Sequence, residues 1–273
     1  MPRSLHRTVR RGEGGGEPLP DPFPTLAGPG FQARFRRSEL SLVAAEPGDG
    51  KSTFALVAAV TMGQPTLYVS CDSSAHEQAT RLLAMATGRS RDAVEPWLGT
   101  HAGWCATQLS QYGHVTWCFD SGPTLDDIVE ELDAYITQHG QAPALLIIDN
   151  ASDVWLTTGD GEWGNLRALM RELKALAREY DCHVMALHHT AERTDGQGRP
   201  VRPDPAPARS AIQGKISAVP ALVLTLTSNS EYGWMRVSVV KNRSGPSYPD
   251  GKTVVEFLFD PSVMSIRDVR KGK

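Results

Sequence analysis

The nine residues 45–53, Ala-Glu-Pro-Gly-Asp-Gly-Lys-Ser-Thr, constrain what this chain can fold into more than any other stretch. They match the phosphate-binding loop pattern, with Ala45 at the position where the first glycine is usual. The apolar stretch 40–44 before them predicts a buried strand, and residues 52–62 after them predict a helix. Glycines let consecutive backbone N–H groups point into one concavity, and the helix N-terminus adds positive potential there. The alternative interpretation is a glycine-rich turn that only leads into a core helix.

The chemistry expected of this loop is the binding of a nucleoside triphosphate, ATP, together with Mg²⁺. Lys51 is expected to reach the β- and γ-phosphates, and the hydroxyl of Ser52 is expected to hold Mg²⁺. The residues expected to bind the nucleotide are Glu46, Pro47, Gly48, Asp49, Gly50, Lys51, Ser52 and Thr53.

Strand and helix patterns alternate along most of the chain after this loop. Strands are expected at 66–71, 114–120, 144–149, 184–187, 221–227, 234–241 and 254–259, and helices after Ser74 and at 124–139 and 166–180. Right-handed β-α-β connections then predict an α/β fold: one twisted, mostly parallel sheet with helices on both faces, which the last two strands extend in antiparallel fashion. Ligands of such sheets bind at the carboxyl ends of the strands, where Ala45, Asp72, Asp149 and His188 all fall.

The first 37 residues differ in composition from the rest of the chain. Arginines are followed by glycines and then by alternating prolines, and such a segment buries too little apolar surface to offset its ordering entropy. We therefore expect a flexible, basic, Pro/Gly-rich arm at 1–37 and one ATPase domain at 38–273, with only 31–37 packing back onto the domain. The arm arginines are expected either to bind nucleic acid or a neighbouring subunit, or to be solvated; they are Arg3, Arg7, Arg10 and Arg11.

Charge, apolar patterning and cysteine use limit the classes of protein to which the chain can belong. The formal net charge of −3 over 273 residues excludes a globally basic surface, so a nucleic-acid site has to be a local basic patch. No apolar run approaches the ~20 residues that span a bilayer, and the N-terminus lacks the apolar segment of a secretory signal. The four cysteines lack metal-ligand spacing, so we expect reduced thiols and a location in the bacterial cytoplasm, or in the host cytoplasm for a phage-encoded protein.

Polar residues at strand ends carry the expected hydrolytic chemistry. Asp149 ends an apolar strand in the manner of a Walker B aspartate, which helps to hold Mg²⁺ against the phosphates. Asp72 is expected either to orient the attacking water or to cap the helix that follows. His188 and His189 are expected either to read the γ-phosphate and relay its presence to the loop after them, or to be a structural pair.

From about residue 39 to 260, the chain resembles the motor domain of DnaB-type replicative helicases, within the RecA-like superfamily of P-loop ATPases. The stretches that carry the resemblance are 45–53, 68–73 with Glu77-Gln78, 120–124 leading into Asp149-Asn150, 173–179 with 184–189, and 241–246. The resemblance implies a RecA-like fold, with Asp72 at the family's catalytic glutamate and His189 at its sensor glutamine. It also implies that the segment 241–246 supplies a basic finger, Lys241 and Arg243, to the ATP of a neighbouring subunit.

The catalytic set implied by the resemblance is Lys51, Asp72, Asp149, His189, Lys241 and Arg243, with Ser52 and Asp149 as the metal-binding pair. Because the finger comes from another subunit, a homo-oligomer is implied, either a hexameric ring or a filament. The loop 191–215 matches the family's DNA-binding loop in position. Its expected contacts to single-stranded DNA are Arg193, Arg199, Arg202, Arg209 and Lys215. No aromatic residue lies in this loop, so base stacking is not expected there.

Departures from the family pattern keep several functions open. Asp72 is one methylene shorter than the family's glutamate, Lys215 lies near positions where acidic residues are usual, and the family's N-terminal collar domain has no counterpart. The leading expectation is a DNA helicase that couples ATP hydrolysis to translocation and works with replication proteins. One alternative is a recombination, repair or helicase-loader ATPase that does not unwind duplexes. The other is a nucleotide-binding interaction protein with weak hydrolysis.

Overall fold

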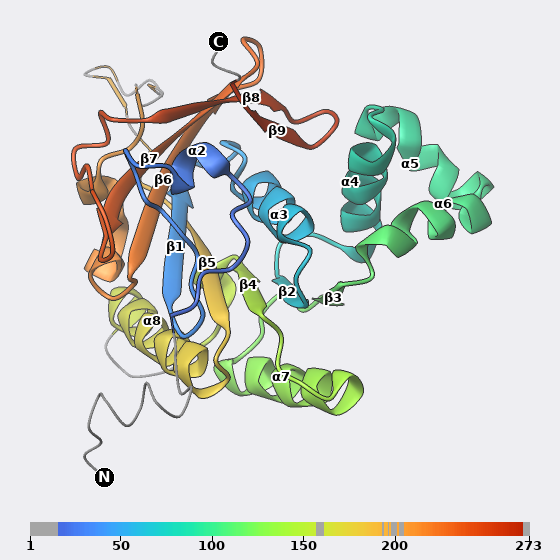
Figure 1. The fold of residues 1–273 in the computed structure, drawn as a ribbon, viewed down its shortest axis with the longest axis horizontal. Coiled ribbons are helices and arrows are strands. Elements are labelled where there is room, and N and C mark those ends of the chain that lie inside the picture. Colours follow the sequence, from blue (N-terminus) through green and yellow to red (C-terminus); the bar gives the residue numbers. More distant parts are fainter. Residues whose placement is uncertain are drawn as a thin grey trace.

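The computed structural model describes residues 16–156, 161–192, 194, 195, 197, 201 and 205–269. Within these residues, nine strands form one sheet in the order β3-β2-β4-β5-β1-β6-β7-β8-β9 (Figure 1). The strands are β1 (Leu40–Ala45), β2 (Thr66–Ser70), β3 (Val115–Cys118), β4 (Leu145–Asp149), β5 (His183–His189), β6 (Leu222–Asn229), β7 (Trp234–Asn242), β8 (Val255–Asp260) and β9 (Ser265–Asp268).

The sheet has the two parts that the sequence predicts. From β3 to β6 all neighbouring strands are parallel, and β6 to β9 pair in antiparallel fashion. The mostly parallel sheet with an antiparallel C-terminal extension is therefore confirmed. β9 is an addition, because a strand of four residues after a short turn has too little periodicity to be recognised.

Helices cover both faces of the parallel part (Figure 1). The helices are α2 (Pro24–Ala27), α3 (Lys51–Met62), α4 (Ala75–Thr87), α5 (Arg91–Thr100), α6 (Ala102–Leu109), α7 (Leu125–His139) and α8 (Gly161–Glu179). α2 and α3 share one apolar cluster with one face of the sheet, and α7 and α8 share a second cluster with the other face. Every residue of β4 is buried, as expected for a central parallel strand covered on both sides.

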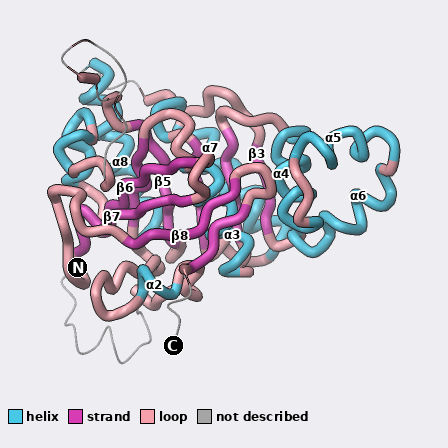
Figure 2. Tube along the Cα trace, turned by 90° about the horizontal axis from the view of Figure 1, so that it is seen from above, coloured by secondary structure: helices cyan, strands magenta, loops and turns pink. Residues whose placement is uncertain are grey.

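The helices α4, α5 and α6 project beyond the β3 edge of the sheet in both Figure 1 and Figure 2. α4 begins as predicted, because the Ser74 side chain accepts a hydrogen bond from the backbone N–H of Glu77. α5 and α6 fall in the segment 88–113, for which the sequence predicts no defined element. Trp97 and Trp104 meet edge-on there with ring centroids 5.3 Å apart.

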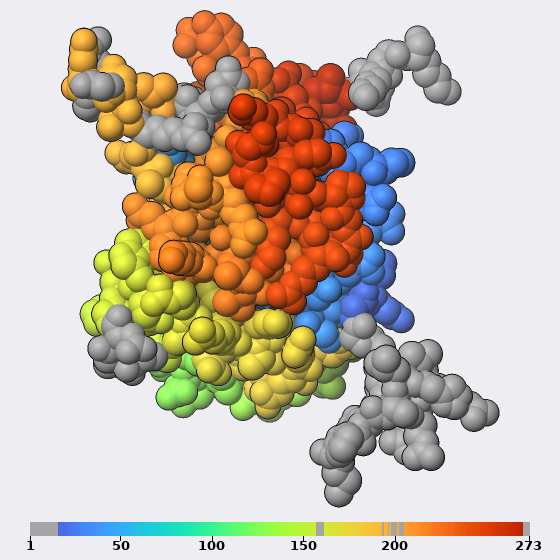
Figure 3. All heavy atoms as spheres, turned by 90° about the vertical axis from the view of Figure 1, so that its left-hand side faces the viewer, coloured from blue at the N-terminus to red at the C-terminus, as the bar shows by residue number. Residues whose placement is uncertain are grey.

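Residues 16–37 pack onto the domain, so the expected flexible arm is wrong for this part of the chain. Leu19, Phe23 and Leu26 are buried in the cluster that includes α3, and the Phe23 ring stacks on Phe54 at 4.4 Å. Figure 3 shows this blue segment beside the red C-terminal strands, and the Asn242 side chain donates hydrogen bonds to two of its carbonyls.

The reason for the error is that the average composition of 1–37 hides a few well-spaced apolar side chains. Those side chains find a ready-made apolar surface on α3 and β8, as the tilted contact of Phe23 with Phe257 shows. The segment 31–37 packs back as predicted, with Phe35 buried. The arm arginines at 3, 7, 10 and 11 lie outside the described residues.

Candidate active site

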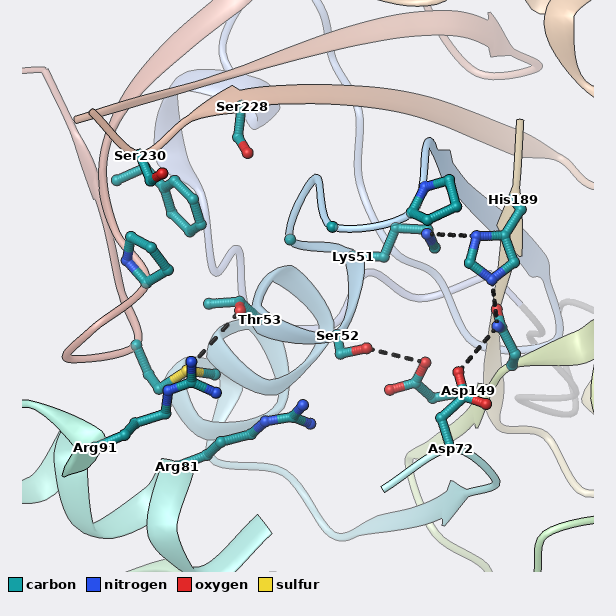
Figure 4. A pocket seen from close by; sticks show the side chains of 17 residues that line it. Lys51, Ser52, Thr53, Asp72, Arg81, Arg91, Asp149, His189, Ser228 and Ser230 are labelled. Atoms are coloured by element: carbon teal, nitrogen blue, oxygen red, sulfur yellow. Dashed lines mark hydrogen bonds between the residues drawn. The ribbon is translucent and has the colours of Figure 1, made fainter. Parts of the chain in front are cut away.

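The carboxyl ends of the parallel strands surround a cavity of about 370 Å³ (Figure 4). Strand register brings the site together, since Ala45 pairs with His189 and Ser70 pairs with Asp149. The cavity is lined by Pro47, Gly48, Gly50, Lys51, Ser52, Thr53, Asp72, Arg81, Arg91, Asp149, Asn150, His189, Ser228, Ser230, Phe259, Pro261 and Met264. The loop therefore meets Asp72 and Asp149 as predicted, but the histidine in the cavity is His189, and His188 lines a different one.

The loop between β1 and α3 has the backbone that its glycines predict. Gly48 and Gly50 have φ values of 82° and 84°, a region that is costly for other residues. A Cβ on Gly50 would also lie 2.8 Å from Cε of Met235. Ala45 occupies the last position of β1, where it is fully buried in an extended strand. An alanine therefore fits at the position where a glycine is usual.

Lys51 is buried at the start of α3 and points back over the loop. Its Nζ lies 3.3 Å from the carbonyl oxygens of Ala45 and Glu46 and 3.0 Å from Nδ1 of His189. Burial lowers the pKa of Lys51 to about 8, and the charges of Asp149, Asp49 and Asp72 act in the opposite direction. An ammonium group kept out of water beside a concave backbone is suited to compensate the charge of phosphate oxygens.

Ser52 and Asp149 form the pair expected to hold Mg²⁺. The Ser52 hydroxyl donates to Oδ1 of Asp149 at 3.1 Å, and the hydroxyl of the buried Tyr68 donates to Oδ2 at 2.7 Å. Burial raises the pKa of Asp149, although both hydrogen bonds lower it. In the part of the chain that the structure describes, no group of three or more His, Cys, Asp or Glu side chains forms a metal site. The pair therefore fits a cation that takes its other ligands from phosphates and water, as Mg²⁺ does.

Asp72 belongs to the cavity and does not cap α4, because Ser74 is the residue at the N-cap position. The helix-capping interpretation of Asp72 is therefore wrong. Oδ2 of Asp72 accepts a hydrogen bond from the Asn150 side chain at 3.1 Å. A second carboxyl, Asp153, lies beside it, and burial together with the Asp72 charge raises the pKa of Asp153 to about 6.

The two histidines at the end of β5 face different sides of the sheet. His189 lines the cavity and contacts Lys51 through Nδ1 and Asn150 through Nε2. His188 is buried on the α8 side, where it lines a second cavity of about 280 Å³ together with Trp155 and Glu162. Burial lowers the pKa of His188 to about 4. Only His189 is therefore placed to meet a nucleotide on the phosphate loop.

Several residues in the cavity or in contact with its lining were missed by the sequence analysis. Arg81 of α4 and Arg91 of α5 point toward the phosphate loop (Figure 4). Arg81 also pairs with Glu77, four residues earlier, so its sequence pattern is that of an ordinary surface pair on a helix. Tyr68 has the pattern of a core residue in a strand, and nothing in the sequence indicates its contact with Asp149.

The structure does not bring Lys241 and Arg243 to the phosphate loop of their own chain. β7 is antiparallel to β6 and runs away from the loop: Lys241 pairs with Val223 at the middle of β1, and Arg243 follows at the end of the parallel strands opposite the loop. Nζ of Lys241 donates to the carbonyls of Ser217 and Ala218 at 3.0 and 2.6 Å. Burial, followed by the charges of Arg243, Arg209 and Lys174, lowers the pKa of Lys241 to about 8.

Of the residues predicted to bind DNA, Arg193, Arg199 and Arg202 lie outside the described residues. Arg209 donates to the hydroxyl and carbonyl of Ser217 at 3.2 and 3.4 Å. Lys215 is exposed in the short helix η4 (Gln213–Ala218). The ring of Trp163 packs against Gly214, where a Cβ would lie 2.7 Å from the indole.

Comparisons with known proteins identify a family and relatives of this chain. Residues 31–195 match the model of a family described as an AAA domain. The gene 65 protein of Mycobacterium phage L5 is 35% identical over 263 residues, covering 93% of this chain and 94% of that protein. The gene 65 protein of Mycobacterium phage D29 is 36% identical over 237 residues, covering 83% and 98%.

Two solved structures have the same fold at 18% sequence identity. One is an ATPase domain, with a TM-score of 0.77 and coverage of 97% of this chain and 96% of that one. The other is a DnaB-like replicative helicase, described with its interactions with primase, with a TM-score of 0.75 and coverage of 97% and 65%. The predicted RecA-like fold of helicase ATPase domains is thus confirmed. Among the described residues, no helix has the length and apolar character needed to cross a membrane.

Proposed function

This chain belongs to the AAA domain family, and we propose that it is a Mg²⁺-dependent ATPase that acts on single-stranded DNA as an oligomer. The observation that carries the proposal is the cavity in which Lys51, the Ser52–Asp149 pair and Asp72 converge. These are the groups that phosphoryl transfer to water requires: a phosphate cradle, a metal pair and a carboxylate for the water.

Each group has one role in the proposed reaction. The backbone N–H groups of residues 48–52 and the ammonium of Lys51 bind the β- and γ-phosphates, while Ser52 and Asp149 hold Mg²⁺. Mg²⁺ held by this pair would neutralise charge on the phosphate oxygens. Asp72 accepts a proton from the attacking water and orients it in line with the γ-phosphate. Arg81 and Arg91 add positive charge from the same chain, which suits a polyanionic substrate.

The finger residues support an assembly of several copies. β7 carries Lys241 and Arg243 away from their own loop, so their proposed contact with a γ-phosphate requires a second copy of this chain. A guanidinium brought in this way neutralises charge that develops on the transferred phosphoryl group. We therefore propose a homo-oligomer, a ring or a filament, with ATP sites between subunits.

Basic and aromatic side chains support single-stranded DNA as the polymer. Lys215 is exposed on η4, and the loop before it adds the predicted arginines. Trp163, against Gly214, and Trp155, which is 69% exposed, lie on the same side of the sheet as α8. Basic groups track a phosphate backbone without reading sequence, and indole rings offer stacking surfaces for bases. We therefore propose that DNA bases stack on Trp155 and Trp163, which lie outside the loop 191–215.

Helicase activity in replication is the leading version of the proposed function. Its support is the fold shared with a DnaB-like replicative helicase, and that fold alone does not distinguish helicases from recombination or loader ATPases. The side chain of Asp72 is shorter than a glutamate, which favours slow hydrolysis. Slow hydrolysis is what we expect of a nucleotide-binding interaction protein. Because both relatives are encoded by phages, we place the activity in the host cytoplasm, with replication or recombination proteins as partners.

Two assays test this function in sequence. ATP turnover is measured with Mg²⁺ over a titration of single-stranded DNA, and we expect turnover that rises with DNA. A forked duplex is then added, and strand displacement that requires ATP identifies a helicase. Stimulated turnover without displacement indicates a recombination or loader ATPase. Nucleotide binding without turnover contradicts the proposed ATPase activity. The remaining hypothesis is then a nucleotide-binding interaction protein.

A further inference from the structure

Tyr68 contacts the proposed metal pair without lining the cavity itself, and the sequence analysis assigns no role to it. Its hydroxyl donates to Oδ2 of Asp149 at 2.7 Å, and its side chain is fully buried. A phenol keeps its proton at neutral pH, so this hydroxyl is the donor and the carboxylate is the acceptor. Any effect of Tyr68 on a bound cation is therefore transmitted through Asp149.

Strand register explains why Tyr68 reaches this carboxylate. β2 and β4 are parallel neighbours, with Ser70 opposite Asp149 and Tyr68 two residues earlier on the same face of β2. The Ser70 hydroxyl is the nearer one along the strand, but it donates to the carbonyl of Ser73 at 2.8 Å and accepts from Gln78 at 3.1 Å. The longer side chain of Tyr68 reaches diagonally across the strand pair and takes the carboxylate instead.

The ring of Tyr68 is held by aromatic neighbours, which fixes the place of its hydroxyl. Trp117 lies opposite Tyr68 in the register of β2 with β3, and the two rings stack with centroids 4.7 Å apart. Trp117 in turn stacks on Phe119, with centroids 5.8 Å apart. A buried side chain packed in this way has little rotational freedom. The donor to Asp149 is therefore a rigid one.

The two carboxylate oxygens of Asp149 are divided between two donors. Oδ2 accepts from Tyr68, and Oδ1 accepts from Ser52 at 3.1 Å. Asp149 is 2% exposed, so bulk water does not compete for Oδ2. A carboxylate that is held through one oxygen presents the other in a single orientation. Hydrogen bonds of this kind behind a metal-binding group typically change metal affinity by about 10–100-fold when they are lost.

We propose that Tyr68 is a positioning residue that makes the site selective for Mg²⁺, because it holds Oδ2 of Asp149 and keeps Oδ1 directed toward Ser52. Mg²⁺ demands a near-ideal octahedral arrangement of oxygens, whereas Ca²⁺ accepts variable numbers and arrangements of them. A carboxylate that is free to turn therefore costs the site more Mg²⁺ affinity than Ca²⁺ affinity. This inference rests on the proposed Mg²⁺-dependent ATPase function.

Tyr68→Phe tests the proposal, since it removes one oxygen atom and keeps the ring. The full-length wild type and variant are titrated with Mg²⁺, and separately with Ca²⁺, at a fixed concentration of a fluorescent, non-hydrolysable ATP analogue. The readout is the ion concentration that gives half-maximal binding of the analogue. We expect Tyr68→Phe to require about 10-fold more Mg²⁺ or more, with a clearly smaller increase for Ca²⁺. The Kd of the analogue without divalent ions should not change, because Lys51 and the loop are untouched.

The control and a second variant separate positioning from general damage. Tyr135→Phe makes the same change at a tyrosine that is 4% exposed on α7, outside the cavity, and should leave both ion requirements unchanged. Thermal unfolding shows whether Tyr68→Phe is folded. If it is not, Trp117→Leu keeps the hydroxyl but loosens its ring, and it should raise the Mg²⁺ requirement more than the Ca²⁺ requirement. A wild-type Mg²⁺ requirement in the folded variant, or equal increases for both ions, overturns the proposal.

The same titrations separate failure of this inference from failure of the proposed function. If the wild type binds the analogue equally well with and without divalent ions, the proposed metal pair fails, and the Mg²⁺-dependent ATPase fails with it. If binding by the wild type requires Mg²⁺ and Tyr68→Phe has the same requirement, the ATPase stands and only the role of Tyr68 is rejected.

Discussion

Lys51 is the residue on which the proposed chemistry depends most. Burial and nearby carboxylates act on its pKa in opposite directions. Burial lowers its pKa to about 8 in the free protein, against the opposing charges of Asp149, Asp49 and Asp72. A bound triphosphate favours the ammonium form, so the pKa of Lys51 in the complex lies above this value. Binding above about pH 8 therefore requires uptake of a proton.

We expect the affinity for ATP to fall as the pH rises above about 8, by at most roughly tenfold per pH unit for one proton. The measurement is the Kd of a fluorescent ATP analogue with Mg²⁺ from about pH 7 to about pH 10. Lys51→Ala should bind weakly and lose this slope. Lys174→Ala is the control: burial also lowers the pKa of Lys174, but this residue lies on α8, outside the cavity, and its removal should leave the slope intact. An affinity that is constant over this range contradicts the assigned contact.

At the residue level, strand-end positions could be predicted and side-chain partners could not. The carboxyl ends of parallel strands share one edge, so a residue such as Asp149 can be placed from its strand alone. Asn150 directly follows it, but its hydrogen-bond partners are His189, at the end of β5, and Asp72, in the loop after β2. Tyr68 and Arg81 have the patterns of a core residue and a helix surface pair, and only three-dimensional packing directs them toward Asp149.

The element with the clearest proposed link to DNA is the segment from the end of β5 to η4. Arg209 is tied to Ser217 within the protein, whereas Lys215 is exposed. A cation that is already bound to carbonyls contributes less to counterion release than a free one. The basic side chains to remove first are therefore Lys215 and the predicted loop arginines, rather than Arg209.

Replacing Arg199, Arg202 and Lys215 with alanine should weaken binding of single-stranded DNA and flatten its salt dependence. The expected change is up to about 0.7 in the slope of log K against log salt for each phosphate that the variant no longer neutralises. ATP turnover without DNA should persist, and its stimulation by DNA should fall. Arg89→Ala is the control, since Arg89 stacks on Trp97 in the helical projection beyond β3. If the slope of the triple variant equals that of the wild type, these residues do not contact phosphates.

At the element level, long periodic segments were predicted well and short or tertiary-dependent ones were not. β4 and α3 have continuous apolar or helical patterns that need no partner to be recognised. β9 has four residues, and α5 contains Pro96, which interrupts the helical pattern. Residues 16–37 are ordered by the surface onto which they pack, and a composition average cannot show that surface.

For the whole molecule, the sheet separates the two halves of the proposed active site. The phosphate loop follows β1 at the carboxyl end of the parallel strands, and Arg243 follows β7 at their amino end. Arg243 donates weakly to the carbonyl of Val219 at 3.5 Å and is otherwise exposed. The phosphate loop and Arg243 of a single copy therefore do not meet. In the proposed assembly, the Arg243 side chain of one copy reaches the phosphate loop of its neighbour.

Mixing two inactive variants tests this central claim most directly. Lys51→Ala has no functional loop but keeps its finger, and Arg243→Ala keeps its loop but has no finger. Arginine fingers contribute roughly 10³–10⁵ in rate, so interfaces that pair an intact loop with an intact finger stand well above background. Subunit exchange is first demonstrated with labelled protein. We predict that each variant alone is inactive and that the exchanged mixture partly recovers ATP turnover. If exchange occurs and the mixture remains as inactive as its components, the ATP site is not shared between copies.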